Sequence, residues 1–169
     1  MGLFGPAWKS KDENKALMAV KNETVLPTLE KISREALFES VRNEAHRKCQ
    51  NYFFSIAKNK GNTYEQREQR LSALKNITDQ ELLIKLALEY DHTSYSEGAF
   101  FSAILERITD HQYACSKGVH GWEQISKRVT SKDIDYGEER IIPKNDLYIT
   151  YKCKWCGKAE EKFVDSNMK

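Results

Sequence analysis

The segment 151–158, Tyr-Lys-Cys-Lys-Trp-Cys-Gly-Lys, constrains the fold of this chain more than any other feature. Two residues separate Cys153 from Cys156, the spacing with which a tight turn presents two thiolates to one side of a tetrahedral metal ion. Gly157 follows directly and can adopt the positive φ that folds the backbone under the metal. The segment therefore predicts a zinc knuckle. A redox dithiol and a pair of unliganded thiols are the alternatives, and a thioredoxin-like motif would instead open a helix after a strand.

Two further ligands must come from elsewhere in the chain. Cys115 and His120 lie upstream in the segment 114–122, Ala-Cys-Ser-Lys-Gly-Val-His-Gly-Trp. Together with the knuckle they make three cysteines and one histidine, a donor set typical of structural zinc sites. His111 is an alternative to His120 as the fourth ligand, and Cys115 could instead be a buried residue of a helix. We predict one structural Zn²⁺ per chain, bound by these two residues and the knuckle.

The sequence before these ligands is typical of helices. Apolar residues recur at helical spacing and predict helices over residues 12–25, 34–58, 64–77, 79–90 and 96–108. A short pattern, Leu-polar-polar-Ile-Ser/Thr, occurs at residues 29–33, 74–78 and 105–109. It predicts a helix end followed at once by a helix start, with Ser33, Thr78 and Thr109 as N-caps. Repeated helix pairs of this kind are the signature of α-solenoids.

The pattern changes after residue 117, where glycines and polar residues become frequent. Residues 147–151 and 162–164 are rich in β-branched and aromatic side chains and predict strands. The expected fold is mainly α, with irregular HEAT-like helical repeats over residues 1–114. A small β-rich, zinc-ribbon-like module is expected over residues 115–169.

Several short motifs support this division. The helical part contains the opening Met-Gly-Leu-Phe-Gly, the Trp-Lys-Ser-Lys at 8–11 and the Leu-x-x-Ile-Thr-Asp-Gln repeat. After it come His-Gly-Trp at 120–122 and Cys-Lys-Trp-Cys-Gly at 153–157. Together they resemble a group of bacterial HEAT-like repeat proteins of uncharacterised function. In those proteins, helical repeats are often followed by a His-x-Trp element and a Cys-x-x-Cys-Gly knuckle. The resemblance implies a fold and implies no reaction.

Sequence motifs for catalysis are absent. The chain contains no Gly-rich phosphate loop, no His-Glu-x-x-His and no nucleophile-elbow sequence, so we expect no enzymatic activity and no small-molecule substrate. His46 and Cys49 are three residues apart on a predicted helix, and we interpret them as a surface histidine beside a buried thiol rather than as a second metal site. Lys and Arg number 27 against 25 for Asp and Glu, which gives no global argument for nucleic acid or for an anionic membrane.

The cellular location is expected to be cytoplasmic. No secretory signal is recognisable, and no apolar stretch approaches the roughly 20 residues of a membrane-spanning helix. Four cysteines in such a chain are better explained by metal binding or burial than by disulfides.

Two functions remain open. The helical repeats favour an interaction scaffold or adaptor that binds another protein. The alternative is nucleic-acid binding by the basic zinc module, with contacts from Lys152, Lys154, Trp155 and Lys158. Under the first interpretation, Trp122 and Trp155 pack around the zinc site and the lysines are solvated.

Overall fold

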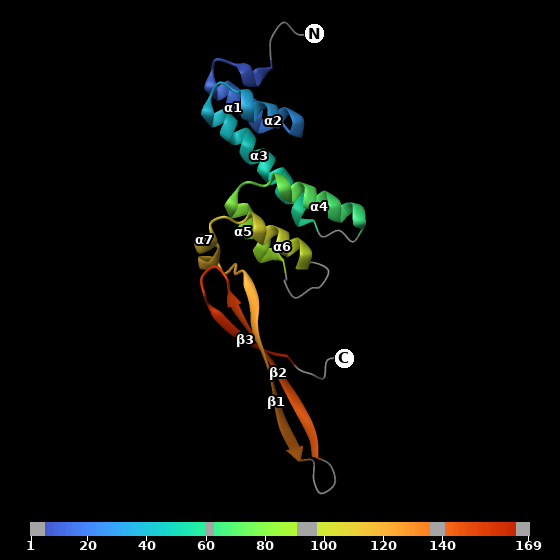
Figure 1. The fold of residues 1–169 in the computed structure, drawn as a ribbon. Coiled ribbons are helices and arrows are strands. Elements are labelled where there is room, and N and C mark those ends of the chain that lie inside the picture. Colours follow the sequence, from blue (N-terminus) through green and yellow to red (C-terminus); the bar gives the residue numbers. More distant parts are fainter. Residues whose placement is uncertain (1–5, 60–62, 91–97, 136–140, 165–169) are drawn as a thin grey trace. The chain divides into compact units, whose positions relative to one another are not determined.

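The computed structural model describes residues 6–59, 63–90, 98–135 and 141–164. It is mainly helical, with a small antiparallel sheet near the C-terminal end, which confirms the expected fold class (Figure 1). The chain divides into two compact units, Met1–Arg107 and Ile108–Lys169, whereas the sequence analysis places the boundary after residue 114. Helix α7 (His111–Ser116), which carries Cys115, thus belongs to the second unit.

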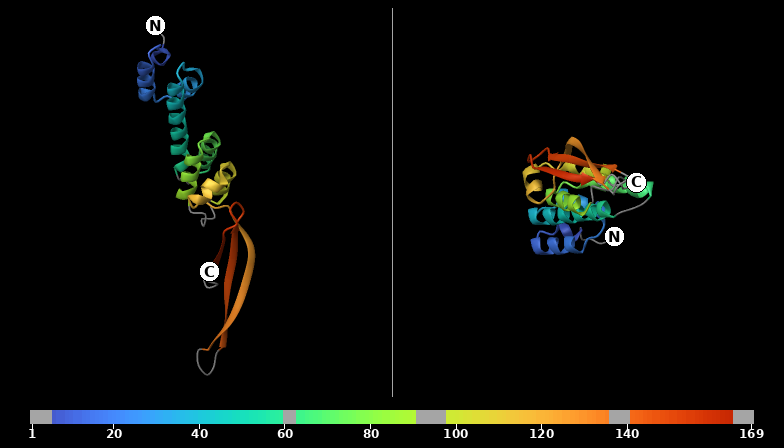
Figure 2. Two further views of the ribbon diagram at one scale, coloured as in Figure 1. Left: turned by 90° about the vertical axis from the view of Figure 1, so that its left-hand side faces the viewer. Right: turned by 90° about the horizontal axis from the view of Figure 1, so that it is seen from below.

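The first unit, called here the helical unit, begins with a short 3-10 turn. Its elements are η1 (Ala7–Lys9), α1 (Glu13–Asn22), α2 (Leu26–Glu35), α3 (Glu39–Lys58), α4 (Tyr64–Asn76), α5 (Gln80–Glu89) and α6 (Gly98–Arg107). The long helix α3 contacts α1 and α2 near one end and α4 and α5 near the other (Figure 2). Trp8, Val20, Leu29, Ile32 and Val41 belong to the core between η1 and α3.

The structure divides the long predicted helix 34–58. Helix α2 ends at Glu35 and α3 begins at Glu39, and the Arg42 guanidinium donates across the break to the carbonyl oxygens of Ala36 (2.7 Å) and Leu37 (3.1 Å). Most of α2 lies outside the predicted helices. Pro27 explains this difference. Proline breaks a helix in its interior but is tolerated in the first turn, where backbone N–H groups have no intrahelical partner, and Pro27 stands in the first turn of α2.

The repeated pattern marks helix boundaries at two of its three occurrences. Helices end just before Thr78 and Thr109 and restart just after them, as predicted. The N-caps are wrong by one residue, because Asp79 and Asp110 accept the first-turn N–H groups. A carboxylate is favoured there by the helix dipole. Ser33 does not cap a helix; it lies inside α2 and its hydroxyl donates to the Glu30 carbonyl oxygen.

Two polar side chains of α3 satisfy backbone groups at the ends of other helices. Lys48 Nζ lies 2.5–3.1 Å from three carbonyl oxygens at the C-terminal end of α1. Gln50, only 4% exposed, donates to the Asn76 carbonyl oxygen (3.1 Å) and accepts from the N–H groups of Thr78 (2.7 Å) and Asp79 (3.2 Å). The connection from α4 to α5 is therefore held by one side chain of α3.

The second unit, called here the ribbon unit, contains α7 and a sheet of strand order β1-β2-β3. The strands are β1 (Trp122–Asp135), β2 (Ile141–Cys153) and β3 (Ala159–Val164). Strand β1 pairs with β2 from Trp122↔Cys153 to Asp135↔Ile141, and β3 pairs with residues 147–152 of β2. The predicted strands at 147–151 and 162–164 are confirmed. Strand β1 was not predicted, because its charged and polar residues hide any apolar alternation.

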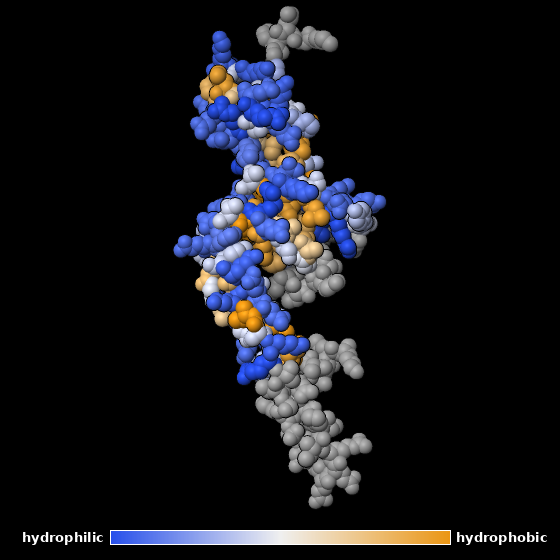
Figure 3. Space-filling model, in the orientation of Figure 1, coloured by the Kyte–Doolittle hydropathy of each residue, from blue (hydrophilic) through white to orange (hydrophobic). Residues whose placement is uncertain are grey.

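The surface of the helical unit is largely hydrophilic in the view of Figure 3, with separate hydrophobic patches. Its exposed large apolar side chains include Met18, Leu37, Tyr64 and Leu88. Among the described residues, no helix has both the length and the apolar character needed to cross a membrane.

Candidate metal centre

One half of the candidate centre is formed where helix α7 ends. The Gly118 N–H donates to the Cys115 carbonyl oxygen (3.1 Å) and the Val119 N–H donates to that of Ala114 (3.0 Å). These are the two bonds of a Schellman motif, and Gly118 has the positive φ, +89°, that the motif requires. Val119 and Ala114 are both buried, as the apolar contact of such a motif demands. The reversal brings His120 back beside Cys115.

The knuckle forms the other half. The Cys153 N–H donates to the Lys158 carbonyl oxygen (2.8 Å), and the Gly157 N–H donates to that of Cys153 (2.9 Å). The Trp155 N–H points at the Cys153 sulfur, 3.4 Å away. Gly157 has φ +76°, as its position after the second cysteine predicts. The turn therefore directs backbone N–H dipoles toward the thiolate that would bind the metal.

Gly121 joins the two halves. The Lys154 N–H donates to the Gly121 carbonyl oxygen (2.9 Å), next to the pair Trp122↔Cys153 that begins the sheet. A Cβ on Gly121 would lie 3.0 Å from Trp155 Cε2 and 3.1 Å from Lys154 Cε. A side chain at this position would require the Trp155 ring and the Lys154 side chain to shift by a few tenths of an ångström. The sequence analysis did not identify this role, and the only signal was a glycine between a predicted ligand and a tryptophan.

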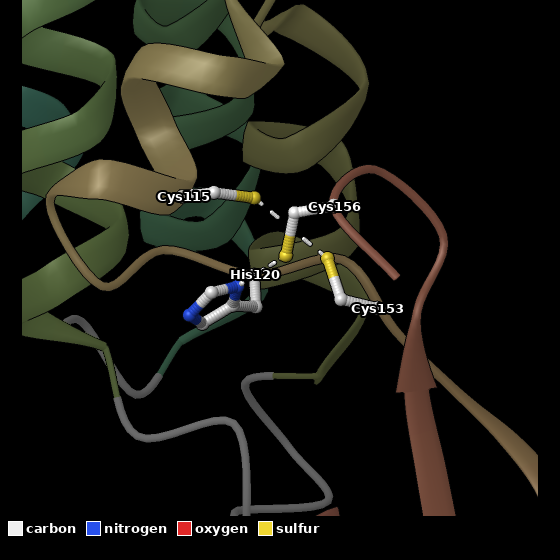
Figure 4. A group of neighbouring side chains, drawn as sticks. All are labelled: Cys115, His120, Cys153 and Cys156. Carbon is white, nitrogen blue, oxygen red and sulfur yellow. Dashed lines mark hydrogen bonds between the residues drawn. The ribbon is translucent and has the colours of Figure 1, made fainter. Parts of the chain in front are cut away.

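The four predicted ligands converge in the folded ribbon unit (Figure 4). Their ligand atoms all lie within 4.8 Å of one another, with Cys115 Sγ 3.8 Å from Cys153 Sγ and Cys156 Sγ 3.5 Å from His120 Nδ1. A tetrahedral zinc with ordinary bond lengths separates two sulfur ligands by about 3.8 Å and a sulfur from a nitrogen by about 3.6 Å. The cysteines are not disulfide-bonded, and a disulfide would need a sulfur separation near 2.0 Å. The group has the composition and spacing to hold a metal ion.

The protons in this group are distributed unevenly. Burial, and then hydrogen bonds with Cys156 and Cys153, raise the pKa of Cys115 to about 12. Burial alone would also raise the pKa of Cys153, but hydrogen bonds from the backbone N–H groups of Cys156 and Trp155, together with those of the His120 and Cys156 side chains, lower it to about 6. Cys153 thus becomes a thiolate before Cys115. A divalent cation would supply the positive charge that lets Cys115 lose its proton as well.

The remaining candidate ligands lie elsewhere. His111 stacks on the Trp155 ring, with centroids 4.5 Å apart and planes inclined by 5°, and does not belong to the cluster. Cys49 is buried in the core of the helical unit, and His46 is exposed. Among the described residues, the cluster of three cysteines and His120 is the one group of this kind.

Two tryptophans near the centre pack against histidine rings. The Trp122 ring lies 4.9 Å from that of His120, and Trp155 is stacked on His111. Both tryptophans are half-buried, while Lys152, Lys154 and Lys158 are exposed. This is the arrangement expected if the tryptophans support the metal site.

Comparisons with models of known protein families, with curated proteins and with solved structures find no match. The likeness to bacterial HEAT-like repeat proteins therefore stays a prediction.

Proposed function

We propose that this protein binds one Zn²⁺ through Cys115, His120, Cys153 and Cys156, and that the ion is structural. The observation that carries the proposal is the ligand spacing, 3.8 Å between two sulfurs and 3.5 Å between sulfur and nitrogen. Three thiolates and an imidazole favour zinc over magnesium or calcium, which prefer oxygen ligands. Four protein ligands complete a tetrahedron and leave no position for water or substrate.

Few side chains of the ribbon unit are buried among those that the structure describes. Of its residues whose side chains the structure describes, the buried ones are Ile108, Ala114, Val119, Gly121 and Cys153. Strand β3 is exposed along its whole length. A small sheet without a packed apolar face is marginally stable in water. Binding of structural zinc supplies about 10–16 kcal/mol in small domains, so folding of the ribbon unit would be coupled to the metal.

For the protein as a whole we propose a non-catalytic scaffold or adaptor, located in the cytoplasm, whose helical unit binds another protein. The exposed apolar side chains Leu37 (67% exposed) and Leu88 (56%) supply contact area of the kind that protein interfaces bury. The likeness to helical-repeat proteins supports the same function, because such stacks present extended binding surfaces.

Nucleic-acid binding by the ribbon unit is the second candidate. It is favoured by the composition of residues 111–128 and 147–164, which hold seven Lys and Arg against three Asp and Glu. Lys152, Lys154 and Lys158 are exposed there and could contact phosphates. Trp155 fits the role of a base contact less well, because His111 already covers one side of its ring.

The zinc site is tested by the metal content of the untagged full chain, purified without chelator and measured by mass spectrometry. We expect one zinc per chain in the wild type and in Cys49→Ser, and none in a Cys153→Ser, Cys156→Ser double variant. A wild type without zinc, or a double variant that retains it, would contradict the proposal.

The adaptor function is tested by quantitative affinity purification with the full chain. We expect a protein partner that the wild type enriches and that Leu37→Arg or Leu88→Arg loses, with zinc still bound. The absence of any such partner would count against a role of the helical unit in protein binding.

A further inference from the structure

Arg128, Tyr148 and Phe163 form one row across the three strands of the sheet. The register pairs Arg128 with Tyr148 and Tyr148 with Phe163, so the three side chains share one face. The two aromatic rings lie 5.4 Å apart at 53°, and the Arg128 guanidinium carbon lies 5.1 Å from the centre of the Tyr148 ring. Phe163 is 51% exposed, which is unusual for so large an apolar side chain.

The face stays open from this row toward the knuckle. The next row contains Ser126, Thr150 and Glu161, and the one after it contains Glu123, Lys152 and Ala159. Small side chains on two of the strands leave space beside the rings. Glu161 pairs with Arg128 at 3.4 Å, but both side chains are largely exposed, and such a pair contributes little. A phosphate could replace this carboxylate as the partner of Arg128.

The described part of the ribbon unit nearest the knuckle has an excess of basic residues, counted over both faces of its sheet and over α7. Residues 111–128 and 147–164 have the excess of basic residues described above. The rest of the hairpin, 129–146, holds three Lys and Arg against five Asp and Glu. A polyanion would therefore be attracted to the half of the sheet that carries the aromatic row and the knuckle.

We propose that this face binds single-stranded nucleic acid, with a base stacked on the exposed ring of Phe163, which Tyr148 supports, and phosphates paired with Arg128 and Lys152. Exposed aromatic rings flanked by cations are the features with which proteins bind single strands irrespective of sequence. A duplex keeps its base faces stacked and could use only the cations. The inference rests on the second candidate function and moves its base contacts from Trp155 to the sheet.

The test is fluorescence anisotropy of the full chain with short, mixed-sequence, single-stranded RNA and DNA and with the matching duplex, at low and at raised salt. We expect the single strands to bind more tightly than the duplex and to be released by salt. Phe163→Ala and Tyr148→Ala should each weaken binding at least about fivefold, the lower end of what one stacked base contributes. Phe163→Trp should retain binding, and the control Tyr64→Ala, at a tyrosine 76% exposed in the helical unit, should not change it.

Three results would overturn the inference. The first is that the metal-loaded protein does not bind single strands, and the second is that it binds the duplex as tightly as the single strands. The third is that the loss of either ring leaves the affinity for single strands unchanged. An acidic peptide that binds through the same rings, when the oligonucleotides do not, would assign the face to a protein partner. Zinc content is measured on every variant, so a failed zinc site is distinguished from a sheet that holds metal but binds no nucleic acid.

Discussion

Gly118 stands in the turn between two predicted ligands, and replacing it with alanine should weaken metal binding. Its φ is +89°, a conformation that residues with a Cβ avoid, and a Cβ built there would meet nothing within 4 Å. Gly118→Ala therefore introduces backbone strain without a steric clash. Strain of this kind costs about 1–2 kcal/mol.

The strain should appear in the zinc affinity. The backbone conformation at Gly118 directs the chain from Cys115 to His120, and the bonds of the Schellman motif are made only when it is adopted. If folding of the ribbon unit is coupled to metal binding, the cost lowers the affinity directly. About 1–2 kcal/mol corresponds to zinc binding that is about 5-fold to 30-fold weaker.

The affinity is measured on the full chain by competition with a chromophoric chelator at neutral pH. Gly118→Asn should lie between alanine and wild type, because asparagine tolerates positive φ better than alanine does. Gly98→Ala is the matched control, since a Cβ there also meets nothing and no positive φ is required. An affinity of Gly118→Ala equal to that of wild type, or an equal loss in Gly98→Ala, would refute the reasoning.

Three further perturbations test other parts of the structure. Gln50→Leu leaves one carbonyl and two N–H groups of the α4–α5 connection without their partner and should lower the free energy of unfolding of the helical unit by about 2–4 kcal/mol in urea. The control Gln69→Leu, at an exposed position of α4, should change it by less than about 0.5 kcal/mol; equal effects would contradict the assigned bonds. Zinc affinity should fall as the pH is lowered, because the thiols must lose their protons to bind the ion and burial raises the pKa of Cys115 to about 12; an affinity that does not change from neutral pH down to pH 6 would be inconsistent with thiolate ligands. Removal of the metal with a chelator should abolish the protection of β2 and β3 amides from hydrogen exchange and leave α3 amides protected. Loss of protection in α3 would show that the two units do not fold independently.

The cluster of candidate metal ligands could be predicted because its chemistry depends on residue type and spacing. Cys153, Cys156 and the glycine after them specify a local turn, and few residue types other than Cys and His can supply the remaining ligands. The pairing of the knuckle with Cys115 and His120 depended on elimination rather than on geometry. The Schellman motif at Gly118 provides that geometry, and its sequence signal is a glycine followed by an apolar residue after a helix.

Other elements were beyond the reach of local patterns. Strand β1 is polar on both faces, and its pairing with β2 defines it. The start of α2 was obscured by Pro27, which is unfavourable inside a helix and favourable at its beginning. The aromatic row of Arg128, Tyr148 and Phe163 depends on the register of three strands and could not be read from residues that lie far apart in the sequence.

The central claim is a closed zinc site of three sulfurs and one nitrogen. Zinc X-ray absorption of the purified full chain measures this ligand set directly. We expect three sulfur neighbours at about 2.3 Å and one nitrogen at about 2.0–2.1 Å. A first shell with fewer than three sulfurs, or one that contains water oxygen in place of the imidazole, would contradict it.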